Sequence, residues 1–360
     1  MSDHEPEVLV SVEGAVGRLT LNRPKALGAL TTGMVATMTA ALLAWRENDA
    51  VRAVLIDHAG DRGFCAGGDI RFLAESAAEG GVAACRFFFT EYQLNHLLFV
   101  YDKPVIAIMD GITMGGGVGI SMPARYRIAT ERTTFAMPET GIGLFPDVGG
   151  GWHLPRLHGA TGVWLALTGA RLKAAECELL GICTDVVNAA SLPALRMAIL
   201  ADPDAIETAL AELEWDPGPA AIAAHRDDID RLFAGSTVEA IFAALEADGS
   251  EWAKAQLAIL GAKSPLSMKT SLRQLRAGGA MTDFADDMAM EMRIAARIVM
   301  SHDFTEGVRA VIVEKDNQPA WNPATLAGVT DAMLAAVFAP LPADEEWRPL
   351  PELTAAGTRG

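Results

Sequence analysis

The sequence predicts an α/β fold whose core is a superhelix of repeated strand, loop and helix turns, followed by a helical C-terminal region. The stretch 51–56 (VRAVLI) is β-branched and almost continuously apolar, which is typical of a strand covered on both faces. A strand, a glycine-bearing loop and a helix then follow each other twice, with Gly68 and Gly116 at equivalent places. Such a repeat favours turns of a superhelix over a single wound sheet. Beyond about residue 160 the spacing of apolar residues predicts mostly helix.

The N-terminal elements are predicted from the spacing of apolar residues. Residues 8–12 and 16–22 are predicted strands, because Leu19 and Leu21 alternate with polar neighbours. A helix is expected from about Thr32, since apolar side chains recur there every three or four residues. The apolar positions of that helix are Met34, Met38, Leu42 and Trp45.

The predicted core continues through further strands and helices. Its expected elements are a loop at 63–68, a helix from about Asp69, a helix at 83–98, a strand at 104–109, a loop at 111–119 and short strands within 125–136. A helix over 174–180 is expected to end at Gly181, because glycine readily adopts the left-handed conformation that ends many helices.

These patterns divide the chain into three parts. The parts are an α/β core at 1–200, a helical C-terminal region at 201–340 and a loose tail at 341–360, which is rich in proline and charge. Amphipathic helices are expected at 236–247 and 282–300. The stretch 214–219 (EWDPGP) has the composition of a linker.

The charge of the chain limits its partners. With 29 Lys and Arg against 46 Asp and Glu, the 360 residues carry a formal net charge of −17. Such a field opposes binding to nucleic acid or to an anionic membrane surface, but a local basic patch can still hold one small anion. The most apolar stretch, 104–124, contains Asp110 and several glycines, so no membrane-spanning segment is expected.

The cysteines and the first residues predict a cytoplasmic protein. No CxxC pair is present, which favours a reducing compartment over a disulfide framework. The opening residues MSDHEPE are acidic and lack the basic and apolar regions of a signal peptide. The four cysteines are Cys65, Cys85, Cys177 and Cys183.

Several common catalytic motifs are absent from the sequence. There is no GxGxxG and no GxxxxGK[ST], which excludes the usual dinucleotide and P-loop sites. There is no HExxH, and the seven histidines are scattered, so no metal site is expected. Without GxSxG, the nucleophile elbow of the α/β hydrolases is also excluded.

Two glycine-rich loops are candidate binding sites. They are 63–70 (GFCAGGDI) and 111–119 (GITMGGGVG), each between a predicted strand and a predicted helix. Free backbone N–H groups at two such helix starts can bind one carbonyl oxygen, which is the arrangement of an oxyanion hole. For either loop taken alone, tight turns and close helix packing are the favoured explanation, and the presence of both loops shifts the balance toward a binding site.

An acidic segment, 135–147 (FAMPETGIGLFPD), is the third candidate. It places Glu139 and Asp147 among apolar residues, with a proline directly before each. An apolar pocket raises the pKa of a carboxyl group and removes its water, which suits a general base or a nucleophile. Helix capping or a solvated loop is the alternative interpretation of these carboxylates.

Together these segments resemble the enoyl-CoA hydratase/isomerase (crotonase) superfamily, most closely its 3-hydroxyisobutyryl-CoA hydrolase branch. The resemblance covers nearly the whole chain, and the runs FPDVGGG and EGVRAVIVEKD are typical of that branch. It implies a crotonase-like fold, an acyl-CoA thioester as the substrate and no separate cofactor. The matching stretches are 21–27 (LNRPKAL), 64–71 (FCAGGDIR), 111–121 (GITMGGGVGIS), 135–157 (FAMPETGIGLFPDVGGGWHLPRL), 165–173 (LALTGARLK) and 302–324 (HDFTEGVRAVIVEKDNQPAWNPA).

The resemblance also implies roles for individual residues. The N–H groups of Gly68 and Gly116 would hold the thioester oxygen. Glu139 would be the catalytic carboxylate, and Asp147 would lie near the acyl hydroxyl or the attacking water. Glu91 would contact the substrate. The residues expected to line the coenzyme A channel are Lys25, Ala26, Leu27, Ala66, Asp69 and Ile70.

One departure from the wider superfamily bears on the reaction. Hydratases place a first glutamate two residues after the glycine triplet, and that position is Gly119 here. The resemblance therefore implies hydrolysis of 3-hydroxyisobutyryl-CoA in valine breakdown. An enoyl-CoA isomerase or hydratase, and an acyl-CoA binder without activity, remain alternatives, and the acyl preference is open. Because the superfamily commonly forms trimers or hexamers, a homo-oligomer is a further expectation.

Overall fold

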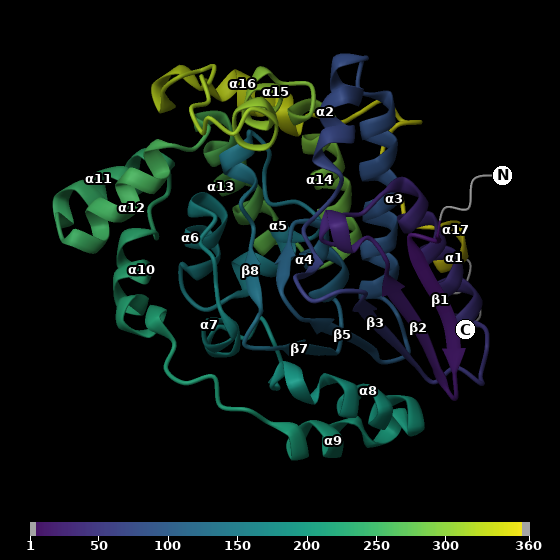
Figure 1. Cartoon of the computed structure of the whole chain (residues 1–360). Coiled ribbons are helices and arrows are strands. Elements are labelled where there is room, and N and C mark those ends of the chain that lie inside the picture. The colour runs from purple at the N-terminus through teal and green to yellow at the C-terminus, as the bar shows by residue number, and fades with distance from the viewer. Residues whose placement is uncertain (1–4, 355–360) are drawn as a thin grey trace. The chain divides into compact units, whose positions relative to one another are not determined.

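The computed structural model of the chain describes residues 5–354 and contains two compact units, each built from separate segments of the sequence (Figure 1). Within the described range, unit 1 consists of 5–68, 93–135 and 171–223, and unit 2 consists of 69–92, 136–170 and 224–354. These units differ from the predicted division at about residue 200, because 69–92 and 136–170 cluster with the C-terminal helices. The predicted linker 214–219 lies shortly before the last change from unit 1 to unit 2.

The main sheet of unit 1 has six strands in the order β1-β2-β3-β5-β7-β9. Strands β1 and β2 form an antiparallel hairpin, and the later neighbouring pairs are parallel. The register places Leu19 beside Ile56, and Ile56 beside Ala107. Strands β3 and β5 are buried along their whole length, as the apolar run at 51–56 predicts. The strands are β1 Val8–Glu13, β2 Val16–Leu21, β3 Ala53–His58, β5 Val105–Met109, β7 Tyr126–Ala129 and β9 Asp185–Val186.

Helices cover both faces of this sheet. Two of them, α8 (Leu192–Ala201) and α9 (Ile206–Leu213), share a buried cluster with Val16 and its neighbours on one face, and Figure 1 shows them beside the strands. Gly17 points the opposite way, because neighbouring strand residues alternate, and it lies against the Trp45 ring of α1 (Thr32–Arg46).

A second sheet in unit 1 has three short strands, β4 (Gly63–Cys65), β6 (Ile112–Met114) and β8 (Thr134–Ala136). The sequence predicts only loops at the first two positions, because strands of three residues are too short to show alternation. Each of those strands leads into a glycine loop, and α4 (Gly116–Ser121) follows the second loop. A Cβ on Gly117 would overlap the carbonyl oxygen of Cys65, so the two loops are in direct contact.

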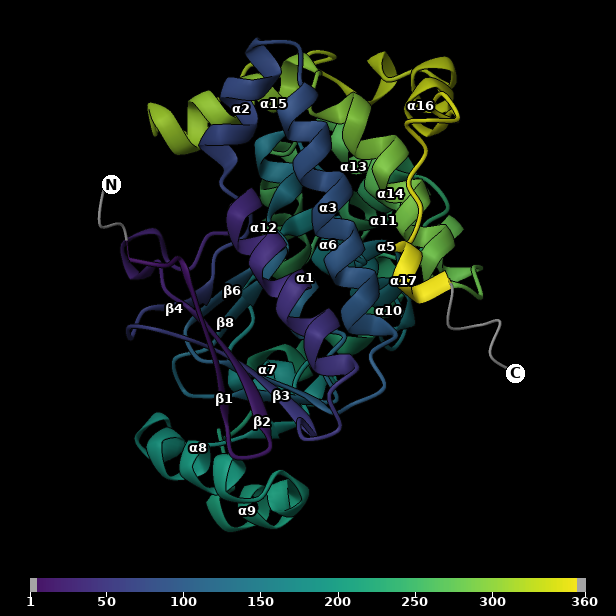
Figure 2. The same ribbon diagram turned by 90° about the vertical axis from the view of Figure 1, so that its right-hand side faces the viewer.

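Unit 2 is mainly helical. Helix α13 packs against α5 and α6, and Figure 2 shows α13 and α14 side by side. The helices predicted at 236–247 and 282–300 are α11 and α14. The helices of unit 2 are α2 Ile70–Ala78, α5 Gly150–His153, α6 Thr161–Thr168, α10 Arg226–Leu232, α11 Val238–Asp248, α12 Glu251–Gly261, α13 Pro265–Gly279, α14 Phe284–Ile298, α15 His302–Val308, α16 Asp331–Phe338 and α17 Pro351–Thr354.

The other predicted helices are also present. The helix expected at 83–98 is α3 (Val82–Phe99), which begins in unit 2 and ends in unit 1. The helix expected at 174–180 is α7 (Ala174–Leu179), and Gly181 after it has a φ of +71°, as its predicted role in ending the helix requires.

The segment after residue 340, predicted to be loose, is fixed at Trp347 within the described range. Its side chain is 5% exposed, and its indole N–H donates to the carbonyl oxygen of Phe89 in α3 at 3.1 Å. The Nε–H group of Arg293 in α14 is shared between the two carboxylate oxygens of Glu346, each 3.0 Å from Nε. Burial of a tryptophan together with these bonds accounts for the order that composition alone does not predict. Residues 355–360 of the predicted tail lie outside the described residues.

Between residues 5 and 354, no helix combines the length and the apolar character that crossing a membrane requires. All four cysteines are free thiols, and three of them are buried. The buried ones are therefore small core residues, as the absence of a CxxC pair suggests.

Replacing Gly117 with alanine tests the contact between the two glycine loops. The new Cβ would overlap the Cys65 carbonyl oxygen and lie 2.9 Å from the Cys65 Cβ, so one loop has to move. We expect the free energy of unfolding to fall by about 1–3 kcal/mol, the usual cost of overpacking, as measured by urea denaturation.

Gly261→Ala is the matched control for this change. A Cβ there meets nothing within 4 Å, and Gly261 is the last residue of α12. Alanine is the better helix former, so the control should be neutral or more stable by up to about 1 kcal/mol. Equal stability of Gly117→Ala and the unchanged protein would contradict the contact between the loops.

Candidate active site

Gly68 and Gly116 lie in loops that leave the second sheet at the same end. Strands β4 and β6 are parallel neighbours, and an ideal Cβ on Gly67 would lie 3.7 Å from the backbone nitrogen of Gly116. Gly116 is the first residue of α4, so its N–H has no acceptor within the helix. Within the described part of the chain, neither Gly68 nor Gly116 donates its N–H to a protein acceptor. The predicted meeting of the loops is thus present, with two donors available to a ligand oxygen.

The segment predicted to line a coenzyme A channel begins at the 3₁₀ turn η1 (Pro24–Ala26). The carbonyl oxygen of Leu27 accepts the N–H of Ala66 at 2.9 Å, so this segment lies against the first glycine loop. Lys25 is exposed and therefore available to an anion. The other residues predicted for the channel are half-buried, namely Ala26, Leu27, Ala66, Asp69 and Ile70.

Glu139 is the first residue of the 3₁₀ turn η2 (Glu139–Ile142) in unit 2. Its side chain is 4% exposed, and its Oε2 atom has no hydrogen-bond partner. The turn is fixed, because Thr140 donates its hydroxyl to the carbonyl of Leu167 at 3.1 Å and accepts the N–H of Ser264 at 3.1 Å. A buried, unpaired carboxylate oxygen in a fixed turn is unusual and marks a site for a ligand.

Asp147 is held by a tyrosine from α3. The hydroxyl of Tyr92 donates to Oδ2 of Asp147 at 2.8 Å, and both side chains are buried. Burial raises the pKa of Asp147 to about 7, because loss of water outweighs the stabilisation that Tyr92 and a backbone hydrogen bond give to the charged form. Asp147 therefore changes its charge near neutral pH.

The charge of Asp147 raises the pKa of two neighbouring acids. Burial raises the pKa of Glu91 well above its ordinary value, and the charge of Asp147 adds to this effect. Burial and then the charge of Asp147 also raise the pKa of Glu139 well above its ordinary value, while Lys263 acts in the opposite direction. Oε1 of Glu91 has no hydrogen-bond partner. Raised pKa values bring such carboxyl groups closer to the range in which a side chain can exchange protons with a substrate.

The structure groups the predicted residues into two sets. Glu91, Glu139 and Asp147 share one electrostatic environment in unit 2, and Gly68 and Gly116 lie in the touching loops of unit 1. Among residues 5–354, no group of His, Cys, Asp and Glu has the arrangement of a metal site.

Tyr92 is a site residue that the sequence analysis missed. The available signal was its position directly after Glu91 in the run RFFFTEYQLN. A buried tyrosine hydroxyl usually has a polar partner, but the sequence does not reveal which residue it is.

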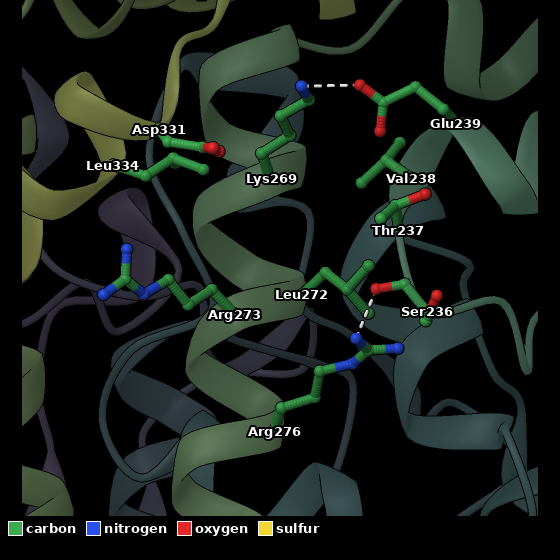
Figure 3. Close-up of a pocket in the computed structure, with 10 residues that line it drawn as sticks. All are labelled: Ser236, Thr237, Val238, Glu239, Lys269, Leu272, Arg273, Arg276, Asp331 and Leu334. Carbon is green, nitrogen blue, oxygen red and sulfur yellow. Dashed lines mark hydrogen bonds and ion pairs between the residues drawn. The ribbon is translucent and has the colours of Figure 1, made fainter.

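A separate pocket lies among α11, α13 and α16 of unit 2 (Figure 3). It has a volume of about 220 Å³ and contains none of the predicted site residues. Two of its cations are already engaged: Lys269 pairs with Glu239 at 2.5 Å, and Arg276 donates to the carbonyl oxygens of Gly235 and Ser236. This pocket is therefore not the candidate active site.

The family of the chain follows from a match over most of its length. A protein-family model described as enoyl-CoA hydratase/isomerase matches residues 16–338. The chain belongs to the enoyl-CoA hydratase/isomerase family, as its motifs predict. Within that family it is similar to mitochondrial proteins named 3-hydroxyisobutyryl-CoA hydrolase. The relative from Danio rerio is 42% identical, covering 93% of this chain and 90% of the relative, and the one from Homo sapiens is 42% identical, covering 92% and 88%.

Solved structures confirm the predicted fold class. A carnitinyl-CoA dehydratase from Mycobacterium thermoresistibile has a TM-score of 0.91 and 42% identity, covering 96% of this chain and 99% of that one. An enoyl-CoA hydratase from Rhodobacter sphaeroides 2.4.1 has a TM-score of 0.87 and 37% identity, covering 95% and 99%. Because similar folds carry names for different reactions, the reaction has to be argued from the site.

Tyr92→Phe removes the hydroxyl that favours the charged form of Asp147. We expect the pKa of Asp147 to rise above its present value of about 7, because burial is then opposed by one hydrogen bond fewer. Carbon NMR of protein labelled at its aspartate carboxyl groups measures this pKa, and Asp147→Asn identifies the resonance.

Tyr101→Phe is the matched control, since the hydroxyl of Tyr101 donates to the carbonyl oxygen of Leu42 at 2.7 Å. That change should leave the pKa of Asp147 where it is. If Tyr92→Phe also left the pKa unchanged, Tyr92 would not stabilise the charged form of Asp147.

Proposed function

We propose that this chain is an acyl-CoA thioester hydrolase that converts 3-hydroxyisobutyryl-CoA and water into 3-hydroxyisobutyrate and CoA. The observation that carries the proposal is the buried Glu139, which has an unpaired oxygen and is electrostatically coupled to Asp147. Such a carboxyl group suits attack on a carbonyl carbon or activation of water. The relatives named 3-hydroxyisobutyryl-CoA hydrolase support this reaction and substrate.

The reaction begins with the thioester oxygen bound by the N–H groups of Gly68 and Gly116. One such donor contributes roughly 3 kcal/mol to the transition state. Glu139 then acts by one of two routes. In the first, it attacks the carbonyl carbon, CoA thiolate leaves, and water opens the resulting anhydride. In the second, it takes a proton from a water molecule that attacks. Both routes break the C–S bond and give a free hydroxy acid and CoA.

Asp147 and Glu91 orient the acyl 3-hydroxyl group or the attacking water. A carboxyl group with a pKa of about 7 accepts a hydrogen bond when charged and donates one when protonated, so either partner can be held. Lys25 supplies an exposed cation for the anionic part of CoA. The resemblance to the hydrolase branch assigns the walls of the coenzyme A channel to Ala26, Leu27, Ala66, Asp69 and Ile70.

An enoyl-CoA isomerase or hydratase is the second candidate, because similar solved structures carry the names dehydratase and hydratase. Addition of water by two glutamates is disfavoured, since the position of the first is Gly119 inside α4. An isomerase needs one carboxylate, which Glu139 supplies. A binder without activity is less favoured. Buried carboxylates make the binding of an anionic ligand less favourable, so a protein that only binds acyl-CoA has no use for them.

Pathway, compartment and assembly extend the proposal. The resemblance to the hydrolase branch implies a place in valine breakdown. The relatives named above are mitochondrial, so the cytoplasmic location of this chain stays a prediction from its cysteine usage. A homo-oligomer, a trimer or hexamer, likewise stays a prediction.

Incubation with 3-hydroxyisobutyryl-CoA and, separately, with crotonyl-CoA tests the function. We expect release of free CoA thiol from the first substrate. Glu139→Gln should lower kcat at least ~100-fold, the low end for general base catalysis, because glutamine neither attacks nor accepts the proton. Retention of more than about a third of the activity would rule out this role. A change in enoyl absorbance without thiol release would favour an isomerase or hydratase, and no reaction would favour a binder.

Single-turnover hydrolysis in ¹⁸O water separates the two routes. The anhydride route should place label in the Glu139 carboxyl group, because water opening the anhydride at that carbon leaves its oxygen there. Label in the product alone is the result of the general-base route, or of an anhydride opened at the acyl carbon, so label in Glu139 is the outcome that identifies the anhydride. Mass spectrometry of the peptide containing Glu139 and of the hydroxy acid measures both, and label in neither would contradict hydrolysis at the carbonyl carbon.

A further inference from the structure

The loop after Asp147 is held by a carboxylate from a helix far along the chain. Oε2 of Glu291, in α14, accepts the N–H of Gly149 at 2.9 Å, and its Oε1 accepts the N–H of Gly151 at 3.0 Å. Glu291 is 0% exposed. Hydrogen bonds to a carboxylate are among the stronger ones in proteins, so two of them in a buried place fix the loop backbone firmly.

A neighbouring side chain completes this support. Gln274, in α13, donates from Nε2 to the carbonyl oxygen of Pro146 at 2.7 Å and to Oε1 of Glu291 at 2.9 Å. Pro146 directly precedes Asp147, and Gly149 follows two residues later. The backbone is therefore held on both sides of the aspartate.

The support matters because the loop is strained. Val148, directly after Asp147, has a φ of +55°, which a β-branched residue rarely adopts. Such a conformation persists only where the surrounding contacts enforce it. Without the bonds from Glu291 and Gln274, the backbone next to Asp147 is free to relax. The carboxyl group of Asp147 then changes its direction together with the backbone.

A second buried acid, Asp287, lies beside this support, and its charge raises the pKa of Glu291. Both acids are buried in α14, and burial raises the pKa of each. A Cβ on Gly151 would overlap Oδ1 of Asp287, so the loop backbone rests directly on this pair of acids. The two acids therefore support the loop, and they leave no space for a side chain at position 151.

We propose that Glu291 is a positioning residue, which holds Gly149 and Gly151 and thereby fixes the direction of Asp147 toward the substrate. The inference rests on the proposed function, since it assigns Asp147 a part in thioester hydrolysis. Glu291 acts through the loop, because its bonds to that loop are to the backbone N–H groups of Gly149 and Gly151.

Glu291→Gln tests the proposal in the full-length protein. Glutamine has the same size, but its NH₂ group faces a backbone N–H that needs an acceptor. We expect kcat for CoA thiol release to fall between about 10- and 100-fold, the effect of a misplaced catalytic group, with KM changed less than about 2-fold.

The same change in an Asp147→Asn background separates positioning from a general structural role. If Glu291 acts through Asp147, the second change should lower kcat by less than about 2-fold. An equal loss in both backgrounds would overturn the proposal. So would unchanged kcat in Glu291→Gln while Asp147→Asn is impaired. Full activity of Asp147→Asn would instead contradict the proposed function.

Two further variants control for stability. Asp230 also accepts a backbone N–H from a distant segment, that of Ala160 at 2.8 Å, so Asp230→Asn should lower the Tm but leave kcat unchanged. If Glu291→Gln does not fold, Gln274→Met removes the donors to Pro146 and Glu291 at nearly constant size. A folded Gln274→Met with unchanged kcat would overturn the proposal.

Discussion

Unit 2 depends on carboxyl groups that are removed from water. Burial raises the pKa of each of these acids, because an isolated charge is costly in a place that water cannot reach. Hydrogen bonds oppose this effect at two of them: Asp147 accepts the hydroxyl of Tyr92, and Glu291 accepts two backbone N–H groups. Proton-exchanging groups are thereby kept in an enclosed, apolar place. The acids are Glu91, Glu139, Asp147, Asp287 and Glu291.

The two units use backbone N–H groups in opposite ways. In unit 2, the N–H groups of Gly149 and Gly151 are occupied by a carboxylate, which makes the loop rigid. In unit 1, the N–H groups of Gly68 and Gly116 have no protein acceptor among the described residues, which leaves them to a ligand. Glycine is needed at positions 151 and 117, because the carboxyl group of Asp287 and the backbone of Cys65 lie where a side chain would be.

Long periodic elements and locally concentrated motifs could be predicted from the sequence. The helix from Thr32 and the segment that carries Glu139 and Asp147 are examples, because their signals lie within a few neighbouring residues. Strands β4, β6 and β8 are too short to show a period. Tyr92 and Glu291 could not be assigned to the site, since each meets its partner only after the chain folds back over a long distance.

The bond from Trp347 to Phe89 bears on how the protein is made. Phe89 lies in the same helix as Glu91. Its carbonyl oxygen accepts a hydrogen bond from Trp347, which follows 258 positions later in the chain. During synthesis from the N-terminus, that helix leaves the ribosome long before α13, α14 and Trp347. Closing so long a loop is slow, and the apolar side of the helix stays uncovered meanwhile. Chaperone demand should therefore be greatest late in translation, when the acidic cluster is still incomplete.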